Sequence, residues 1–401
     1  MKKFNKNILL FGFSICFIAL GFFSLDMLSQ IGDDIAELFN SISSGDISAF
    51  SVFTDNINND SSKRLSYHNQ IMDLNSIKDN ILGTKIIPKD EDTIIKTKSG
   101  SLINKVNQLP KSEIENNVNQ IAKLQKLAES NGASFLYCAA PPKENFETTQ
   151  VNSINYSKSN FDQLLSELKA NQIPYTDFNE IFGDDINSVG RYYYTDHHWT
   201  SLTGFYAYSL ICKNLKKRYG FEYKKMYIDL ENFSVQTYPD WFLGSYGKKV
   251  GTYFTWNGAD DFELIFPKFQ TNLTEEQPFE HEVRNGRFED TVLFFEKMRK
   301  DYYGINSYAM YSGGNSYLQI MKNNMNPSGK KILMIRDSFA CVVAPFLALQ
   351  SSELHVCDLR NLELPGERIN VKDYIEQMKP DYVLVLYSGI NYNADGRYNF
   401  F

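Results

Sequence analysis

The chain has 401 residues, enough for one large domain or two smaller ones. Its 41 Lys and Arg residues against 48 Asp and Glu residues give a net charge of -7, and no long basic run follows the first few residues, which excludes an extended nucleic-acid-binding surface. The five cysteines are widely spaced and form no ligand-spaced cluster with the five histidines. We therefore expect buried free thiols, no metal and no other cofactor.

The N-terminal segment has the pattern of a membrane anchor. Three lysines among the first six residues precede an uncharged apolar run from Ile8 to Leu25, which is close to the length that spans a bilayer. The basic flank predicts a cytoplasmic N-terminus and an exported remainder. A cleaved signal peptide is the alternative, but Phe22 and Phe23 occupy the place where small residues would mark cleavage. We predict an uncleaved signal anchor within residues 1–30.

Residues 31–110 are polar and only weakly periodic, with apolar islands near residues 81–87 and 93–95. Such a composition, rich in Asn, Asp, Ser and Lys, is typical of loops between periodic segments. We predict a stalk or peripheral lobe that leads to the main domain.

An alternation of helices and strands begins at Lys111. Residues 111–131 carry apolar residues at helical spacing and end at Gly132, and the apolar run 133–140 is typical of a buried parallel strand. A helix at 161–170 and a short strand at 173–178 follow. This order predicts an α/β fold with a doubly wound, mostly parallel sheet, whose ligands bind at the carboxyl ends of the strands.

The middle of the chain contains one long helix and an aromatic region. Thr200 or Ser201 can cap a helix that runs to Tyr219 and stops at Gly220. From residue 221 to about 269 the pattern is aromatic, rich in glycine and strand-like. We predict a β-rich insertion at about 221–300, with a lid or a substrate wall as its use.

The alternation returns near the C-terminus and completes the main domain. The pattern predicts strands at 331–335, 354–359 and 382–387, with helices at 339–350 and 371–378. Residues 111–401 are therefore assigned to one catalytic domain with its insertion.

A carboxylate and an imidazole stand close together just before the long helix. Asp196 lies two residues before His198, and such a pair has the groups needed to orient an imidazole and stabilise its cation. A histidine at a helix start is often only a capping or packing residue. His197 is expected to be a neighbour without a catalytic role.

A serine occupies the corresponding edge of the predicted sheet. Ser338 follows the apolar strand 331–335 at the expected start of a helix, where backbone N–H groups and the helix dipole would face a developing oxyanion. Ordinary capping by Asp337 and Ser338 is the alternative interpretation. Both candidates fall at the loop edge of one sheet, so a Ser–His–Asp site is a stronger hypothesis than either part alone.

Five short motifs together resemble the DHHW protein family, which is similar to the SGNH-hydrolase-like alginate O-acetylation proteins. They are Asp196-His197-His198-Trp199, Phe242-Leu243-Gly244-Ser245, Gly313-Gly314-Asn315, Arg336-Asp337-Ser338-Phe339 and Asp358-Leu359-Arg360. The resemblance spans roughly residues 100–401. In ordinary SGNH hydrolases the serine block precedes the histidine block, and here the order is reversed.

The resemblance implies an SGNH-hydrolase-like, flavodoxin-like fold in which Ser338 is the nucleophile, His198 the general base and acid, and Asp196 its orienting carboxylate. It implies a cell-envelope enzyme that passes an acetyl group to polysaccharide hydroxyls. The acetyl group would be supplied by a multi-spanning membrane O-acyltransferase. The predicted anchor would hold the domain beside such a partner, at the extracytoplasmic face of the membrane.

The residues that would stabilise the oxyanion or bind substrate are less specific. The backbone N–H near Ser338 is the first candidate donor, and Asn391, Asn315 and Gly244 are additional candidates. Arg336 either binds substrate or pairs with a carboxylate.

Two other functions fit the same residues. A carbohydrate esterase would use the same triad to remove acetyl groups, and the exclusion of water decides between hydrolysis and transfer. A non-catalytic polysaccharide-binding or assembly protein would use the aromatic insertion instead. The presence of all three polar residue types of the triad weighs against that function.

Overall fold

The computed structural model describes residues 68–89, 92–146, 155–181, 190–360, 369–389 and 396–401. The chain forms two compact units, residues 1–79 and 80–401, and helix α4 (His68–Ile81) ends just inside the second. The predicted signal anchor at 1–30 lies outside the described residues. Along the residues that are described, none of the helices is both long enough and apolar enough to cross a membrane.

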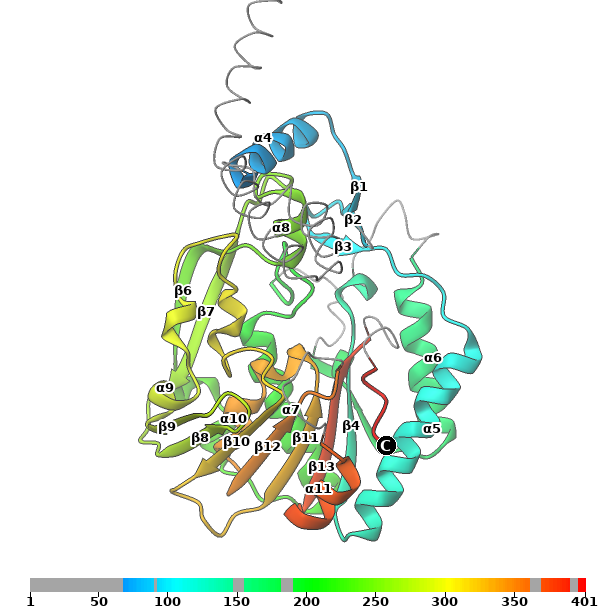
Figure 1. Ribbon diagram of the computed structural model, residues 1–401, viewed down its shortest axis with the longest axis vertical. Coiled ribbons are helices and arrows are strands. Elements are labelled where there is room, and N and C mark those ends of the chain that lie inside the picture. Colours follow the sequence, from blue (N-terminus) through cyan, green and yellow to red (C-terminus); the bar gives the residue numbers. More distant parts are fainter. Residues whose placement is uncertain (1–67, 90–91, 147–154, 182–189, 361–368, 390–395) are drawn as a thin grey trace, which may run out of the picture. The chain divides into compact units, whose positions relative to one another are not determined.

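An eight-stranded mixed sheet forms the centre of the second unit (Figure 1). In the order in which the strands lie in the sheet, the first five are parallel to one another. Each of the last three is antiparallel to the strand before it. In sheet order the strands are β5 (Tyr175–Asp177), β4 (Ser134–Ala140), β13 (Tyr382–Ser388), β11 (Lys331–Arg336), β12 (Glu353–Cys357), β10 (Leu318–Asn323), β8 (Leu273–Gln277) and β9 (Glu282–Gly286). The predicted α/β fold is confirmed, but the sheet is more mixed than the mostly parallel one predicted.

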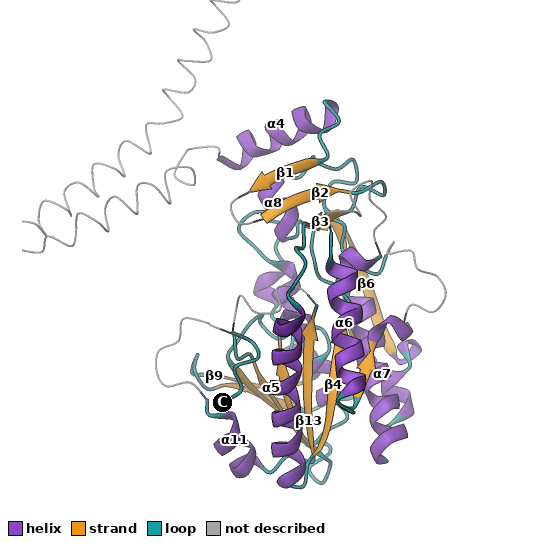
Figure 2. Cartoon of the chain, turned by 90° about the vertical axis from the view of Figure 1, so that its right-hand side faces the viewer, coloured by secondary structure: helices purple, strands orange, loops and turns teal. Residues whose placement is uncertain are grey.

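Helices cover both faces of the sheet, and this is why its central strands read as continuous apolar runs. On one face α5 (Lys111–Ser130), α6 (Ser157–Ala170) and α11 (Val371–Met378) pack in one core, and Figure 2 shows α5 and α6 side by side over the sheet. On the other face α7 (Ser201–Tyr219) and α10 (Ala344–Ala348) form a second core. Helix α7 begins and ends as predicted, because the Thr200 side chain accepts from Thr203 N–H and Gly220 adopts the left-handed conformation.

The region predicted as a β-rich insertion has three parts. Strands β6 (Phe233–Phe242) and β7 (Asp260–Pro267) form a two-stranded sheet, whereas residues 273–286 join the main sheet as β8 and β9. The strand-like interpretation is wrong at Ser245–Val250, which form helix α8. The aromatic and aliphatic residues of α8 pack on a small antiparallel sheet of β1 (Ile86–Lys89), β2 (Asp92–Lys96) and β3 (Leu102–Asn104).

The remaining elements are short. They are helix α9 (Phe288–Thr291) and the 3-10 turns η1 (Lys143–Asn145), η3 (Phe178–Ile181), η4 (Lys225–Ile228), η5 (Leu230–Asn232), η6 (Phe295–Lys297), η7 (Ser307–Met310) and η8 (Ser338–Cys341). The four described cysteines are free and buried, as predicted. The predicted boundaries of the stalk and the catalytic domain stay predictions.

A buried carboxyl in β8 makes stability depend on pH. Glu275 is 0% exposed, and among the described residues neither its Oε2 nor the neighbouring Gln319 Oε1 has a hydrogen-bond donor. Burial raises the pKa of Glu275 to about 7. A folded-state pKa above the unfolded value means that the folded protein binds the extra proton, so the contribution of Glu275 to stability is fully present below pH 4.5 and is lost as pH rises through 7.

Glu275→Gln is therefore expected to raise the free energy of unfolding at pH 8 by roughly 3 kcal/mol, and to flatten its pH dependence between pH 4.5 and 8. Urea unfolding at several pH values measures this. Glu276→Gln is the matched control, because Glu276 is part-exposed and bonds Lys322 at 2.6 Å. Equal pH dependence in both variants would contradict the assignment to Glu275.

Candidate active site

The loop that precedes α7 carries the aspartate and the histidine. A bridge between Tyr192 and Trp199 closes it, and Tyr193 N–H donates to His198 O at 3.2 Å. Because Thr200 then caps α7, the loop has fixed geometry at both ends. Its tip lies at the carboxyl edge of the parallel strands, where the alternation of strands and helices predicted a ligand site.

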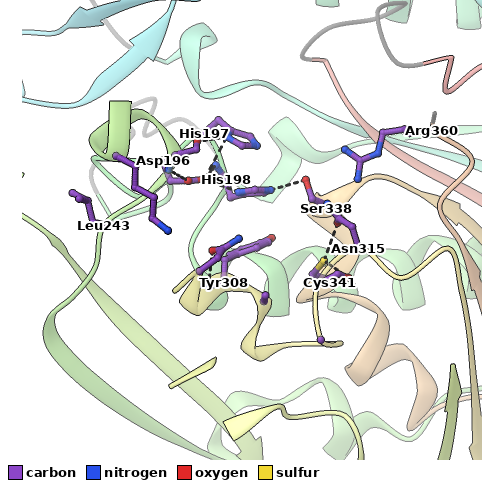
Figure 3. Close-up of a pocket in the computed structure, with 15 residues that line it drawn as sticks. Asp196, His197, His198, Leu243, Tyr308, Asn315, Ser338, Cys341 and Arg360 are labelled. Carbon is purple, nitrogen blue, oxygen red and sulfur yellow. Dashed lines mark hydrogen bonds and ion pairs between the residues drawn. The ribbon is translucent and has the colours of Figure 1, made fainter. Parts of the chain in front are cut away.

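Asp196, His198 and Ser338 form a continuous hydrogen-bonded chain (Figure 3). Asp196 Oδ1 lies 2.5 Å from His198 Nδ1, and His198 Nε2 lies 2.6 Å from Ser338 Oγ. A carboxylate can only accept, so Nδ1 carries a proton and Nε2 is the acceptor for the serine hydroxyl. We call these three residues the triad. This arrangement can remove a proton from Ser338 and stabilise the resulting imidazolium.

The turn that holds Ser338 differs from the helix predicted at residues 339–350. Ser338 begins the single 3-10 turn η8, which Asp337 caps by accepting from Phe339 N–H, and α10 starts separately at Ala344. Pro345 lies at the start of α10, where its missing N–H does no harm. A continuous helix through Pro345 would lose a backbone hydrogen bond. The long helix dipole expected at Ser338 is therefore absent.

Buried hydrogen bonds to the Asp337 side chain fix the position of this turn. The Asp337 carboxylate accepts from Ser388 N–H and Ser388 Oγ, both at 2.7 Å, and from Arg397 at 2.9 Å. Burial would raise the pKa of Asp337, but Arg397 and Arg360 and the bonds from Ser388 hold it below its usual range. Asp337 thereby ties the serine turn to the end of β13 and to the C-terminal segment.

Aromatic packing joins the two halves of the site. The His198 ring stacks on Tyr308, with ring centroids 4.0 Å apart, and lies 5.2 Å from Phe339. Trp199 Nε1 donates to Phe339 O at 3.1 Å. Trp199 thus bonds the histidine loop directly to the residue that follows the serine.

The carboxylate of Asp196 is fully engaged. Oδ1 also accepts from His198 N–H at 2.9 Å, and Oδ2 accepts from Ser245 N–H at 2.5 Å. Burial would raise the pKa of Asp196, but the two neighbouring imidazoles and these hydrogen bonds hold it well below its usual range. Asp196 therefore stays ionised across the physiological pH range.

His197 lines the cavity beside the triad. Its Nδ1 lies 3.0 Å from Ser245 Oγ, and burial together with His198 lowers its pKa to about 3. His197 is thus neutral wherever the triad would operate. The ligand atoms of Asp196, His197 and His198 lie within 4.8 Å of one another, but hydrogen bonds already engage both ring nitrogens of His198.

Two buried charged residues form hydrogen bonds with the backbone of the loop that carries His198. Neither was identified from the sequence. The Lys143 ammonium, 0% exposed, donates to the carbonyl oxygens of Tyr193, Tyr194 and Asp196 at 2.5–2.9 Å. The Asp260 carboxylate accepts from the N–H groups of Tyr194 and Thr195 and from Thr195 Oγ1. Burial raises the pKa of Asp260 to about 6 against these hydrogen bonds.

The position of Lys143 in the sequence could have indicated that it lies near the site. It follows Pro142 directly after the buried strand β4, so its side chain belongs to the ligand edge of the sheet. Asp260 has no comparable signal, because it reaches the loop from 65 residues away.

A cavity of about 520 Å³ opens over Ser338 and His198. All five motifs that carried the family resemblance contribute lining residues, among them Ser245, Gly313, Asn315 and Arg360. In Figure 3, Asn315 and Arg360 lie on the far side of Ser338 from Asp196. The cavity therefore has one wall on the acid–histidine side and another beyond the serine.

The structure separates the remaining candidate residues. The Arg336 guanidinium is 0% exposed, donates to Asn315 Oδ1 and Gly314 O, and lies 3.7 Å from the Asp358 carboxylate, so pairing with a carboxylate is the better interpretation. Asn315 lines the cavity. Asn391 lies outside the described residues.

Gly244 has a steric role. A Cβ atom at this position would lie 2.2 Å from Asp196 Cβ. The Gly244 N–H donates to Thr195 Oγ1 at 2.8 Å. Glycine allows the close approach of α8 to Asp196, and its N–H is not available to an oxyanion.

Comparisons with known proteins identify relatives in sequence and in fold. Residues 102–234 match the family described as "SGNH hydrolase-like domain, acetyltransferase AlgX". No curated protein matches the chain. The fold is similar to a DHHW family protein from Eubacterium siraeum (15% identity, 79% of this chain and 96% of that chain, TM-score 0.59) and to Bacillus cereus PatB1 with a sulfonyl adduct (21%, 79% and 99%, TM-score 0.63). The resemblance predicted from the motifs is confirmed.

Proposed function

We propose that this chain, whose residues 102–234 match the SGNH hydrolase-like domain of the acetyltransferase AlgX family, transfers acetyl groups to polysaccharide hydroxyls through an acetyl-serine at Ser338. The observation that carries the proposal is the hydrogen-bonded triad that lines the cavity, with His198 Nε2 2.6 Å from Ser338 Oγ. If Asp196 and His198 only stabilised the loop, the histidine would have no need of a hydrogen bond to Ser338. The contact between His198 and Ser338 therefore favours catalysis.

The reaction follows from the proton positions. His198 Nε2 takes the hydroxyl proton as Ser338 Oγ bonds to the acetyl carbonyl carbon, and the imidazolium then gives that proton to the departing donor group. In the second half, a sugar hydroxyl gives its proton to His198 and attacks the acetyl-serine. The Ser338 Oγ–acyl bond breaks and Oγ regains the proton.

Two groups can stabilise the oxyanion in this proposal. The Ser338 N–H stands at the first position of η8, where no intrahelical acceptor exists. Asn315 Oδ1 accepts from Arg336 at 2.9 Å, which leaves the Asn315 amide N–H groups for the cavity that the residue lines. Arg336 would act here as a positioning residue for Asn315, and Asn391 stays a sequence-based candidate.

Placement in the cell envelope belongs to the same proposal. The basic flank and apolar run of residues 1–30 support a signal anchor with the catalytic domain on the extracytoplasmic side. A multi-spanning membrane O-acyltransferase would then supply the acetyl group. Cross-linking of the full-length chain in membranes tests for such a partner.

The proposal is tested with a neutral chromogenic acetyl ester as donor. Wild type should accumulate one acetyl group on the peptide containing Ser338, and an acceptor glycan should accelerate ester turnover and become acetylated. Release of free acetate at a rate that no acceptor changes would identify an esterase. Absence of both turnover and Ser338 acetylation would contradict a catalytic role.

A further inference from the structure

Two adjacent lysines in α8 have different surroundings. Lys249 forms an ion pair with Asp92, away from the cavity. Lys248 is half-buried, lines the cavity and donates from Nζ to Ile305 O at 2.7 Å. Within the described part of the chain, no carboxylate lies within ion-pair distance of Lys248.

The ammonium of Lys248 can therefore donate further hydrogen bonds. It carries three N–H donors and one of them is engaged. Burial lowers the pKa of Lys248, against longer-range attraction from Asp196 and Asp301. An anion in the cavity would pair with this charge and accept from the remaining donors.

The carboxylate that lines the described cavity, Asp196, forms no ion pair with Lys248. Both carboxylate oxygens of Asp196 accept hydrogen bonds, from His198 and from Ser245. The other cation of the cavity, Arg360, donates to Asp358 through two hydrogen bonds of 2.8 and 2.5 Å. The neighbouring His197 is uncharged and contributes a polar edge. Among the described residues that line the cavity, Lys248 is therefore the one Lys or Arg without a carboxylate at ion-pair distance.

We infer that Lys248 and His197 form an anion subsite that binds a carboxylate or phosphate group on the acceptor glycan. The inference rests on the proposed function, because it assigns the charged ligand to the acceptor. An acetyl group is small and neutral, so it needs no cation. An anionic substituent bound here would place the acceptor beside His198 and away from the Asn315 wall.

The experiment compares acceptors that differ only in charge. The donor is a neutral chromogenic acetyl ester. The acceptors are a hexuronic acid oligosaccharide, its carboxyl-reduced neutral counterpart and the 6-phosphorylated form of that counterpart. Wild type should transfer acetyl to an anionic acceptor at least about tenfold faster than to the neutral one, and the preferred anion identifies carboxylate or phosphate.

The preference should disappear in Lys248→Met and persist in Lys248→Arg, which keeps the charge. Lys249→Met is the matched control and should keep the wild-type preference. Higher salt should weaken the wild-type preference, which gives a readout if Lys248→Met fails to fold. Equal transfer to the three acceptors, transfer to none, or a preference retained in Lys248→Met overturns the inference. Acetylation of Ser338 in wild type, measured in the same samples, reports separately on the proposed function.

Discussion

Ser338→Ala is expected to lower kcat for acetyl-ester turnover by at least about 10³-fold, since loss of a serine nucleophile removes the covalent step and leaves only weak assistance from the surrounding groups. The acetylated peptide should also disappear from the mass spectrum. The fold should persist, because Ser338 Oγ bonds only His198 in the described structure.

Ser245→Ala is the matched control for this experiment. Ser245 lines the same cavity and lies 3.0 Å from a histidine, His197, yet its contact with the triad is through its backbone N–H. The alanine variant keeps that N–H, so kcat should fall by less than about tenfold. A larger loss in Ser245→Ala than in Ser338→Ala would mean that the nucleophile has been assigned to the wrong serine.

Asp196→Asn is expected to lower kcat by about 10⁴-fold, because an amide nitrogen facing His198 Nδ1 would favour the tautomer in which Nε2 carries the proton. That tautomer cannot accept the proton of Ser338. Either orientation of the amide also conflicts with a backbone donor, since Oδ1 accepts from His198 N–H and Oδ2 from Ser245 N–H. We expect a loss of about 1–3 kcal/mol in unfolding free energy from this conflict.

Steady-state kinetics and urea unfolding of the same sample separate the two effects of Asp196→Asn. The control is Asp261→Asn, an exposed carboxylate that accepts from Asp240 N–H outside the site. It should change kcat by less than about twofold. Near-wild-type activity in Asp196→Asn would remove Asp196 from the mechanism.

Elements with strong local signals could be predicted well. Helix α7 has a capping residue, a helical pattern and a terminal glycine, and strands β4 and β13 are buried on both faces, so their sequences alone determine type and position. Helix α8 has six residues, too few to show a period, and its aromatic and glycine content imitates a strand. Strands β8 and β9 are short and partly polar, and their pairing with the main sheet depends on distant partners.

The site divides in the same way. Asp196 with His198 and Ser338 each stand at a recognisable strand or loop junction, and the topology of an α/β sheet brings such junctions to one edge. The contributions of Lys143 and Asp260 depend on backbone atoms that approach them only in the folded chain, at separations of 50 to 66 residues. No local pattern encodes such contacts.

The place of β13 in the sheet has a consequence for biosynthesis. This strand follows β4 and β11 in the chain, yet it lies between them in the sheet, and Asp337 next to Ser338 bonds its final residue, Ser388. A nascent chain has no partner for the inner edges of β4 and β11 until Tyr382–Ser388 have emerged. Until then, two apolar strand edges are exposed to other chains. Ester turnover should thus appear only after β13 has been made, and truncations that remove Tyr382–Ser388 should aggregate instead of yielding a less active enzyme.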